Sequence, residues 1–242
     1  HHYHPLKGMS REQPIQALSS IACPSAKTPD FVFSHFPLGE IPYDTDSPGG
    51  TWWIHPQSPT TIKNIVATIE TPNPMNKRET LCSFKGSFQS HAGRGEMNEL
   101  FKTAGKGLNC KITNTGSFAS GDPKEYSAFV EDTIFTLCPR GTGKETMRLM
   151  DALMLGSIPV VIYEPYLDMW PVTPPVIIVK SWQEAIKKIA HLKDNTSLLE
   201  KMQNEGQTWL RHETQCQKKS MQALIEWSKM LAWSKDYKNK NE

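Results

Sequence analysis

The stretch that decides the fold reads FTLCPRGTGKETMRLMDALMLGSIPVV, residues 135–161. Its first residues complete an apolar run, 134–138, which predicts a buried strand. A glycine-containing turn follows, and the spacing of apolar residues after it predicts a helix over 145–155. Gly156 is placed to end that helix as a C-cap. The run 158–162 is continuously apolar, as expected of a parallel strand covered on both faces.

The same alternation of apolar runs and helical patterns continues on both sides of this stretch. It predicts an α/β fold with a parallel sheet and helical crossovers. The expected strands are 30–36, 80–87 and 176–179, while 62–69 fits a strand or a helix equally well. The expected helices are 94–105, 182–191, 197–211 and 215–233.

Composition places the chain among ordinary globular proteins. Of 242 residues, 38% are hydrophobic and 21% charged, and the net charge is only +2, so we expect a real core and no partner among nucleic acids. No apolar run reaches the roughly 18 residues that a membrane span needs. No signal peptide is recognisable, although the chain begins at His1 rather than Met and an upstream anchor could have been trimmed.

The five cysteines are scattered and form no C-x-x-C pair. This pattern predicts free thiols in a reducing compartment, with neither a zinc site nor a disulfide framework. A cytoplasmic location is therefore the first expectation, and the Golgi lumen is the alternative if an anchor has been trimmed. One N-glycosylation triplet occurs, Asn195-Thr196-Ser197, and such triplets also arise by chance.

The turn after residue 138 has the chemistry of an anion site. Free N–H groups at a helix start attract negative charge, and Gly141 and Gly143 allow the backbone to approach it. A carboxylate at Asp151 is suited to ribose hydroxyls. The side chains that we expect to bind phosphate oxygens are Arg140, Thr142, Lys144, Thr146 and Arg148.

Two better-known phosphate motifs are absent from this turn. Its Gly141-Thr142-Gly143-Lys144 lacks the first P-loop glycine, and Glu145 stands where a P-loop has the Ser or Thr that holds magnesium. No G-x-G-x-x-G occurs, so the dinucleotide fingerprint is absent as well.

The same residues resemble the signature of the exostosin-like family, glycosyltransferase family 47. The resemblance rests on Cys138-Pro139-Arg140-Gly141, Arg148, Asp151-Ala152-Leu153 and the run 156–161, supported by Phe84-Lys85-Gly86, Arg94, Asp132 and Trp182. It covers about residues 80–190. One departure is Glu145, where the family usually has a small hydroxyl residue, so the local charge differs.

The resemblance implies a GT-B-like fold: a Rossmann-like donor domain over 79–214, a reduced acceptor-side domain over 1–78, and a C-terminal segment, 215–242, whose helix returns to the N-terminal part. Residues 1–78 are shorter than a full Rossmann half. The implied reaction is an inverting transfer from a UDP-sugar (xylose, galactose or a uronic acid) to a glycan or glycoconjugate without an obligatory metal. Lys85 and Arg94 would approach the donor phosphates from a second loop, beside Gly141, Gly143 and Glu145 of the turn.

The catalytic base should come from the N-terminal segment. Candidates are His35, Glu40, Asp44, Asp46 and His55, and we select Glu40 and His35, because Glu40 follows a strand end in a loop. Asp44-Thr45-Asp46 matches the Asp-x-Asp of metal-dependent transferases, but its Pro- and Gly-rich surroundings favour a turn, so no metal ligand is predicted.

Two other functions remain open. One is a GDP-fucose-dependent fucosyltransferase, which has a similar helix before a Gly-x-x-Pro-Val-Val strand. The other is a catalytically silent module that binds a nucleotide or sugar, which the short N-terminal segment favours. The expected partners are a nucleotide-sugar donor and a glycan acceptor, and the sequence does not indicate an oligomeric state.

Overall fold

The computed structural model describes residues 30–32, 49–51, 72–116, 122–141, 146–165, 167 and 174–212, the first two segments by their backbone alone. The chain divides into two compact units. The first comprises residues 1–52, 169–172 and 211–242, and the second comprises 53–168 and 173–210. In the first unit β1 (Asp30–Val32) pairs in parallel with β2 (Gly49–Thr51).

The second unit is built on a parallel sheet of five strands in the order β4-β3-β5-β6-β7. This confirms the predicted α/β class. In chain order the strands are β3 (Thr80–Gly86), β4 (Cys110–Asn114), β5 (Thr133–Leu137), β6 (Ile158–Ile162) and β7 (Ile177–Val179).

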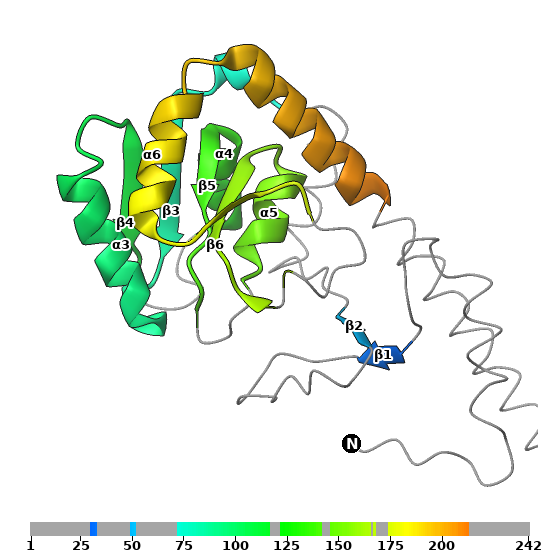
Figure 1. The fold of residues 1–242 in the computed structure, drawn as a ribbon, viewed down its shortest axis with the longest axis horizontal. Coiled ribbons are helices and arrows are strands. Elements are labelled where there is room, and N and C mark those ends of the chain that lie inside the picture. The colour runs from blue at the N-terminus through cyan, green and yellow to red at the C-terminus, as the bar shows by residue number, and fades with distance from the viewer. Residues whose placement is uncertain are drawn as a thin grey trace, which may run out of the picture. The chain divides into compact units, whose positions relative to one another are not determined.

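Helices cover both faces of the sheet (Figure 1). The helices are α3 (Ala92–Thr103), α4 (Pro123–Glu131), α5 (Arg148–Met154), α6 (Trp182–Leu192) and an unlabelled helix, 196–212, with short 3-10 turns at η1 (Met75–Lys77) and η2 (Phe88–Ser90). In both views α3 and α6 lie on one face while α4 and α5 lie on the other. Phe101 of α3 meets Trp182 of α6 edge to face, with ring centroids 6.4 Å apart.

The core lies where these layers meet the central strands. Phe84, Phe135, Leu137 and Val160 are completely buried, and the near-continuous apolar strands β5 and β6 are what a sheet covered on both faces requires. Side-chain caps set the helix starts: Asp122 accepts from Lys124 N before α4, and Ser181 accepts from Glu184 N before α6.

The amino-terminal edge of the sheet is held together by Arg78. Its guanidinium, 6% exposed as a residue, donates to the carbonyls of Val130, Thr133 and Leu155. Gly156 closes α5 beside it with a φ of +70°, the left-handed geometry that was expected of a C-cap. The amino ends of the strands are therefore fixed by buried hydrogen bonds.

Two differences from the sequence expectations concern local structure. The half-exposed strand β4 was not predicted, because its residues are mostly polar and lack a continuous apolar run. The predicted helix over 145–155 begins only at Arg148, so Arg148 opens the helix instead of lying in its second turn. The expected elements 62–69 and 215–233 lie outside the described residues.

The prediction that every cysteine is a free thiol is wrong. Cys82 of β3 and Cys110 of β4 are Cα partners across the two strands and form a disulfide. Among the described cysteines, Cys138 is free and buried. The expectation failed because the two half-cystines are 28 positions apart, and only the register of a strand pair brings them together.

Candidate functional site

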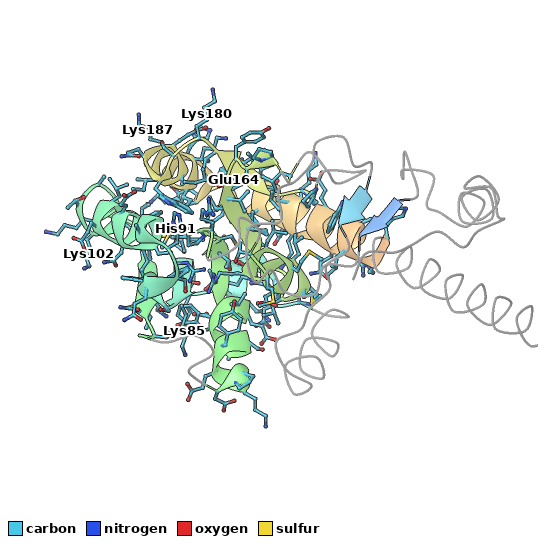
Figure 2. The ribbon with its side chains drawn as sticks, turned by 90° about the horizontal axis from the view of Figure 1, so that it is seen from below. Lys85, His91, Lys102, Glu164, Lys180 and Lys187 are labelled. Carbon is cyan, nitrogen blue, oxygen red and sulfur yellow. A yellow bond between two sulfur atoms is a disulfide. The ribbon has the colours of Figure 1, made fainter. Side chains whose placement is uncertain are left out.

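The strand order places a topological switch point between β3 and β5. Counted along the chain, the sheet reads 2-1-3-4-5, the order of doubly wound folds whose ligands bind outside the carboxyl ends of the strands at that point. The segments that leave these two strands are Ser87 and its neighbours after β3, and Cys138 to Gly141 after β5. Figure 2 shows the molecule from the side of the carboxyl ends of the strands. Lys85, His91 and Glu164 are labelled near the strand ends, whereas Lys102, Lys180 and Lys187 are labelled at the outside of the molecule.

Arg94 of α3 joins the two segments. Its Nη1 donates to the carbonyl of Ser87 at 2.8 Å, and its Nε donates to the carbonyl of Arg140 at 2.9 Å. Burial, followed by the positive charge of Arg148, lowers the pKa of Arg94 to about 10. The guanidinium remains charged at neutral pH and stands in a desolvated position beside a second cation.

Arg148 approaches the same place from α5. Its Nη2 donates to the carbonyl of Lys85 at 2.9 Å, and its Cζ lies 4.4 Å from the centroid of the Phe84 ring. The Cζ of Arg94 lies 5.4 Å from that same centroid. Two guanidinium groups therefore gather at one buried ring at the carboxyl end of β3, where cation–π attraction offsets part of their mutual repulsion.

Two glycines make room for these side chains. A Cβ on Gly86 would lie 2.7 Å from Nη2 of Arg148, and a Cβ on Gly141 would lie 2.9 Å from Nη2 of Arg94. Both distances are too short for a side chain to fit without moving an arginine. The glycines therefore let the arginines lie against the backbone, which is a more specific role than the general flexibility expected of the turn.

Further cations at this edge are only loosely paired. Arg140 Nη1 is 3.8 Å from Glu164 Oε1, and Lys85 Nζ is 3.7 Å from Glu125 Oε2. The Nε atoms of Arg140 and Arg148 are buried and lack a hydrogen-bond partner among the described residues. The edge therefore carries more positive charge and more donor capacity than its own acceptors use.

A buried acid lies beneath the arginines. Asp151 is 1% exposed and accepts from the hydroxyl of Tyr126 at 3.3 Å through Oδ2. Burial raises the pKa of Asp151 to about 6, and the charge of Arg148 opposes that rise. Burial and the nearby Asp151 raise the pKa of Tyr126, and burial raises the pKa of the Cys138 thiol to about 12. At neutral pH the carboxylate is mostly ionised, and it interacts electrostatically with Arg148.

Comparison with known proteins identifies the family. The family described as RXYLT1 C-terminal domain matches residues 63–240, which is well over half of the chain. The chain belongs to this family. RXYLT1 C-terminal domains are a glycosyltransferase family, so the prediction that this chain belongs to a glycosyltransferase family is confirmed.

Two curated relatives carry the name ribitol-5-phosphate xylosyltransferase 1. The Mus musculus protein is 24% identical over 158 residues, 57% of this chain and 35% of its own length. The Danio rerio protein is 26% identical over 100 residues, 40% of this chain and 23% of its own length. This RXYLT1-type chain therefore spans about a third or less of these relatives. A crystal structure of an alpha1,3-fucosyltransferase aligns at 19% identity with a TM-score of 0.43, covering 58% of this chain and 41% of that one.

The RXYLT1-type domain gathers only part of the predicted donor site within the described residues. Five of the predicted residues lie together at the carboxyl edge of the sheet: Lys85, Arg94, Arg140, Gly141 and Arg148. Thr146, two positions before Arg148, is buried. The predicted ribose contact at Asp151 stays a prediction, while its observed partner is Tyr126. Thr142, Gly143, Lys144 and Glu145 lie outside the described residues, as do His35, Glu40, Asp44, Asp46 and His55.

Three site residues were not predicted from the sequence. Tyr126, Ser87 and Glu164 carry no motif, and each reaches the site from a different element. For Ser87 and Glu164, the only indication in the sequence was that each follows an apolar strand, since the functional loops of such sheets lie after the strands.

Two further findings concern the part of the chain that the structure describes. No three His, Cys, Asp or Glu side chains there are grouped so that they could hold a metal ion. No helix there is long and apolar enough to cross a membrane.

Proposed function

We propose that this chain is the donor-binding part of an inverting, exostosin-like glycosyltransferase that transfers xylose from UDP-xylose to a ribitol phosphate acceptor. The observation that carries the proposal is the pair Arg94 and Arg148 converging at the Phe84 ring, 5.4 and 4.4 Å from its centroid, at the switch point of the sheet. A diphosphate is the ligand whose charge best matches such a pair. The names of the mouse and zebrafish relatives favour xylose over galactose or a uronic acid, and favour an alditol phosphate as acceptor.

The arginines would act on the leaving group. In the transfer, an acceptor hydroxyl forms a bond to C1 of the sugar, the bond between C1 and the donor diphosphate breaks, and UDP leaves with additional negative charge. Fixed guanidinium groups stabilise charge that develops in the transition state. We therefore assign Arg94, Arg140 and Arg148 to the diphosphate, with Lys85 at the margin, and propose that they make a metal unnecessary.

The acceptor side of the proposal keeps the sequence-based candidates. Glu40 and His35 remain the proposed bases for the acceptor proton, and residues 1–78 remain the proposed acceptor domain of a GT-B pair. We include the Tyr126–Asp151 contact in the proposed donor site, because the buried Asp151 interacts electrostatically with Arg148.

Binding of nucleotides to the full chain tests the proposal first. Calorimetry with UDP, GDP, CMP and inorganic diphosphate, each with and without Mn²⁺, should show UDP binding that does not need the metal. Arg148→Met keeps an unbranched side chain over Phe84 but removes the charge, and should weaken UDP binding by about 10- to 150-fold, the value of a charge-assisted hydrogen bond of about 1.5–3 kcal/mol. Lys102→Met is the matched control, since that side chain is 61% exposed and pairs with Glu99.

The outcomes separate the competing functions. Absence of nucleotide binding would refute the donor site, and unchanged UDP affinity in Arg148→Met would refute its assignment. A preference for GDP would identify the fucosyltransferase alternative. UDP binding without transfer from UDP-xylose to ribitol 5-phosphate, and without slow UDP-xylose hydrolysis, would support the silent module.

A further inference from the structure

One sequence motif lies outside the proposed donor site. Asn195-Thr196-Ser197 matches the acceptor pattern for N-linked glycosylation, and no other Asn in the 242 residues is followed by that pattern. All three residues, and Asp194 before them, are exposed. Asn195 lies between α6 and the helix 196–212, and Thr196 and Ser197 form the start of that helix. A bulky group attached there would meet solvent and leave the core undisturbed.

The local geometry of Asn195 suits such a modification. Its Oδ1 accepts from the backbone N–H of Leu198 at 3.1 Å, which caps the start of the following helix. N-linked glycosylation uses the other amide atom, Nδ2, and leaves Oδ1 as a carbonyl oxygen. The cap and the sugar can therefore coexist on one side chain.

The position of Asn195 keeps a glycan away from the donor site. Helix α6 follows the carboxyl end of β7 and returns toward the amino-terminal edge of the sheet, so its far end lies opposite the edge that carries Arg94 and Arg148 (Figure 1). The proposed reaction and the modification therefore use opposite ends of the same sheet, and the modification does not depend on the proposed function.

The disulfide supplies the second, independent observation. Cys82 and Cys110 are bonded across β3 and β4, and Cys82 is completely buried. Structural disulfides persist in oxidising compartments such as the secretory lumen and are rare in the cytosol. The free-thiol argument for a cytoplasmic location is thereby removed, and the compartment that favours this disulfide is the one in which N-linked glycans are added.

We propose that Asn195 carries an N-linked glycan acquired in the lumen of the secretory pathway. The co-reactant is a lipid-diphosphate-linked oligosaccharide. A bond forms between Nδ2 of Asn195 and C1 of the first sugar, and the bond from C1 to the lipid diphosphate breaks. The amide proton passes to a base of the host transferase, and the lipid diphosphate leaves.

The test uses the protein expressed from its own complete reading frame in a eukaryotic host, with no leader added. Peptide-N-glycosidase in heavy-oxygen water should increase the gel mobility of the protein and convert Asn195 to labelled Asp in its tryptic peptide. Alkylation of the denatured protein before and after reduction, read on the same digest, should show Cys82 and Cys110 protected until they are reduced.

Three variants give the matched controls. Ser197→Ala removes the required hydroxyl and leaves the Asn195 cap in place, so it should abolish the mobility shift. Ser197→Thr should retain the shift, and Asn195→Asp should abolish it while keeping an oxygen for the Leu198 N–H. Unmodified Asn195 in the wild-type protein, or Cys82 and Cys110 recovered as free thiols, would overturn the proposal.

Discussion

The substitution Asp151→Asn should remove a pH dependence that the buried carboxyl imposes on folding. In the unfolded chain Asp151 ionises near 3.8, whereas in the folded protein burial raises its pKa to about 6. Between these two values the unfolded chain has released the proton and the folded protein still holds it. The free energy of unfolding therefore falls as pH rises from about 4 to about 6, and is level above that range.

The size of the effect follows from the two pKa values. A difference of about 2 between them corresponds to about 3 kcal/mol at 1.36 kcal/mol for each factor of ten. Asn cannot ionise and still offers Tyr126 a carbonyl oxygen. The free energy of unfolding of Asp151→Asn minus that of the wild type should therefore increase by up to about 3 kcal/mol between pH 4 and pH 7.

Urea unfolding at half-unit steps from pH 4 to pH 8, followed by tryptophan fluorescence, measures this difference. Asp194→Asn is the control, because it removes an acid whose side chain is 84% exposed. Arg148→Met should extend the fall in the free energy of unfolding to higher pH, since the positive charge of Arg148 opposes the rise in the pKa of Asp151. A difference for Asp151→Asn that stays level across this range would refute the assignment of a buried, perturbed acid.

Two further substitutions and one reduction test other parts of the molecule. Gly156→Ala should lower the free energy of unfolding by at least about 2 kcal/mol, seen in urea, because φ is +70° and the added Cβ would lie 2.5 Å from Pro72. Reduction of the Cys82–Cys110 disulfide should lower it by about 3–4 kcal/mol for a separation of 28 residues, and a reduced protein of equal stability would contradict the pairing. Gly86→Ala should displace Arg148 and weaken UDP binding by about tenfold in calorimetry with little loss of helix content by circular dichroism.

Local sequence patterns predicted the central part of the fold. The apolar runs at β5 and β6, with Gly156 between α5 and β6, follow rules that act over a few residues, and all three were located correctly. Strand β4 was not predicted because it lies at the edge of the sheet, where side chains need not be apolar. None of its five residues is buried, and three of them are exposed. Edge strands are specified by pairing with a neighbour, which no short window of sequence contains.

The candidate site was predictable to the extent that its residues lie next to strand ends. Arg140 and Lys85 each lie close to the carboxyl end of an apolar strand. Arg148 is the first residue of α5, the helix that comes after β5 in the chain. Tyr126 could not be found in this way, because its partner Asp151 is 25 positions away on another helix. Contacts of this kind depend on how α4 and α5 pack on one face of the sheet.

The arrangement of Arg94 and Arg148 bears on how the proposed site would work. Each guanidinium is already held by backbone carbonyls and by the Phe84 ring, so the free-energy cost of bringing two cations together is met when the chain folds. An incoming diphosphate then meets donors that need little reorganisation, which is the condition under which electrostatic stabilisation contributes most to catalysis. The negative charge of the buried Asp151 at neutral pH attracts Arg148 and so offsets part of the repulsion between the two guanidinium groups. Protonation of Asp151 below about pH 6 should therefore make the edge more attractive to anions.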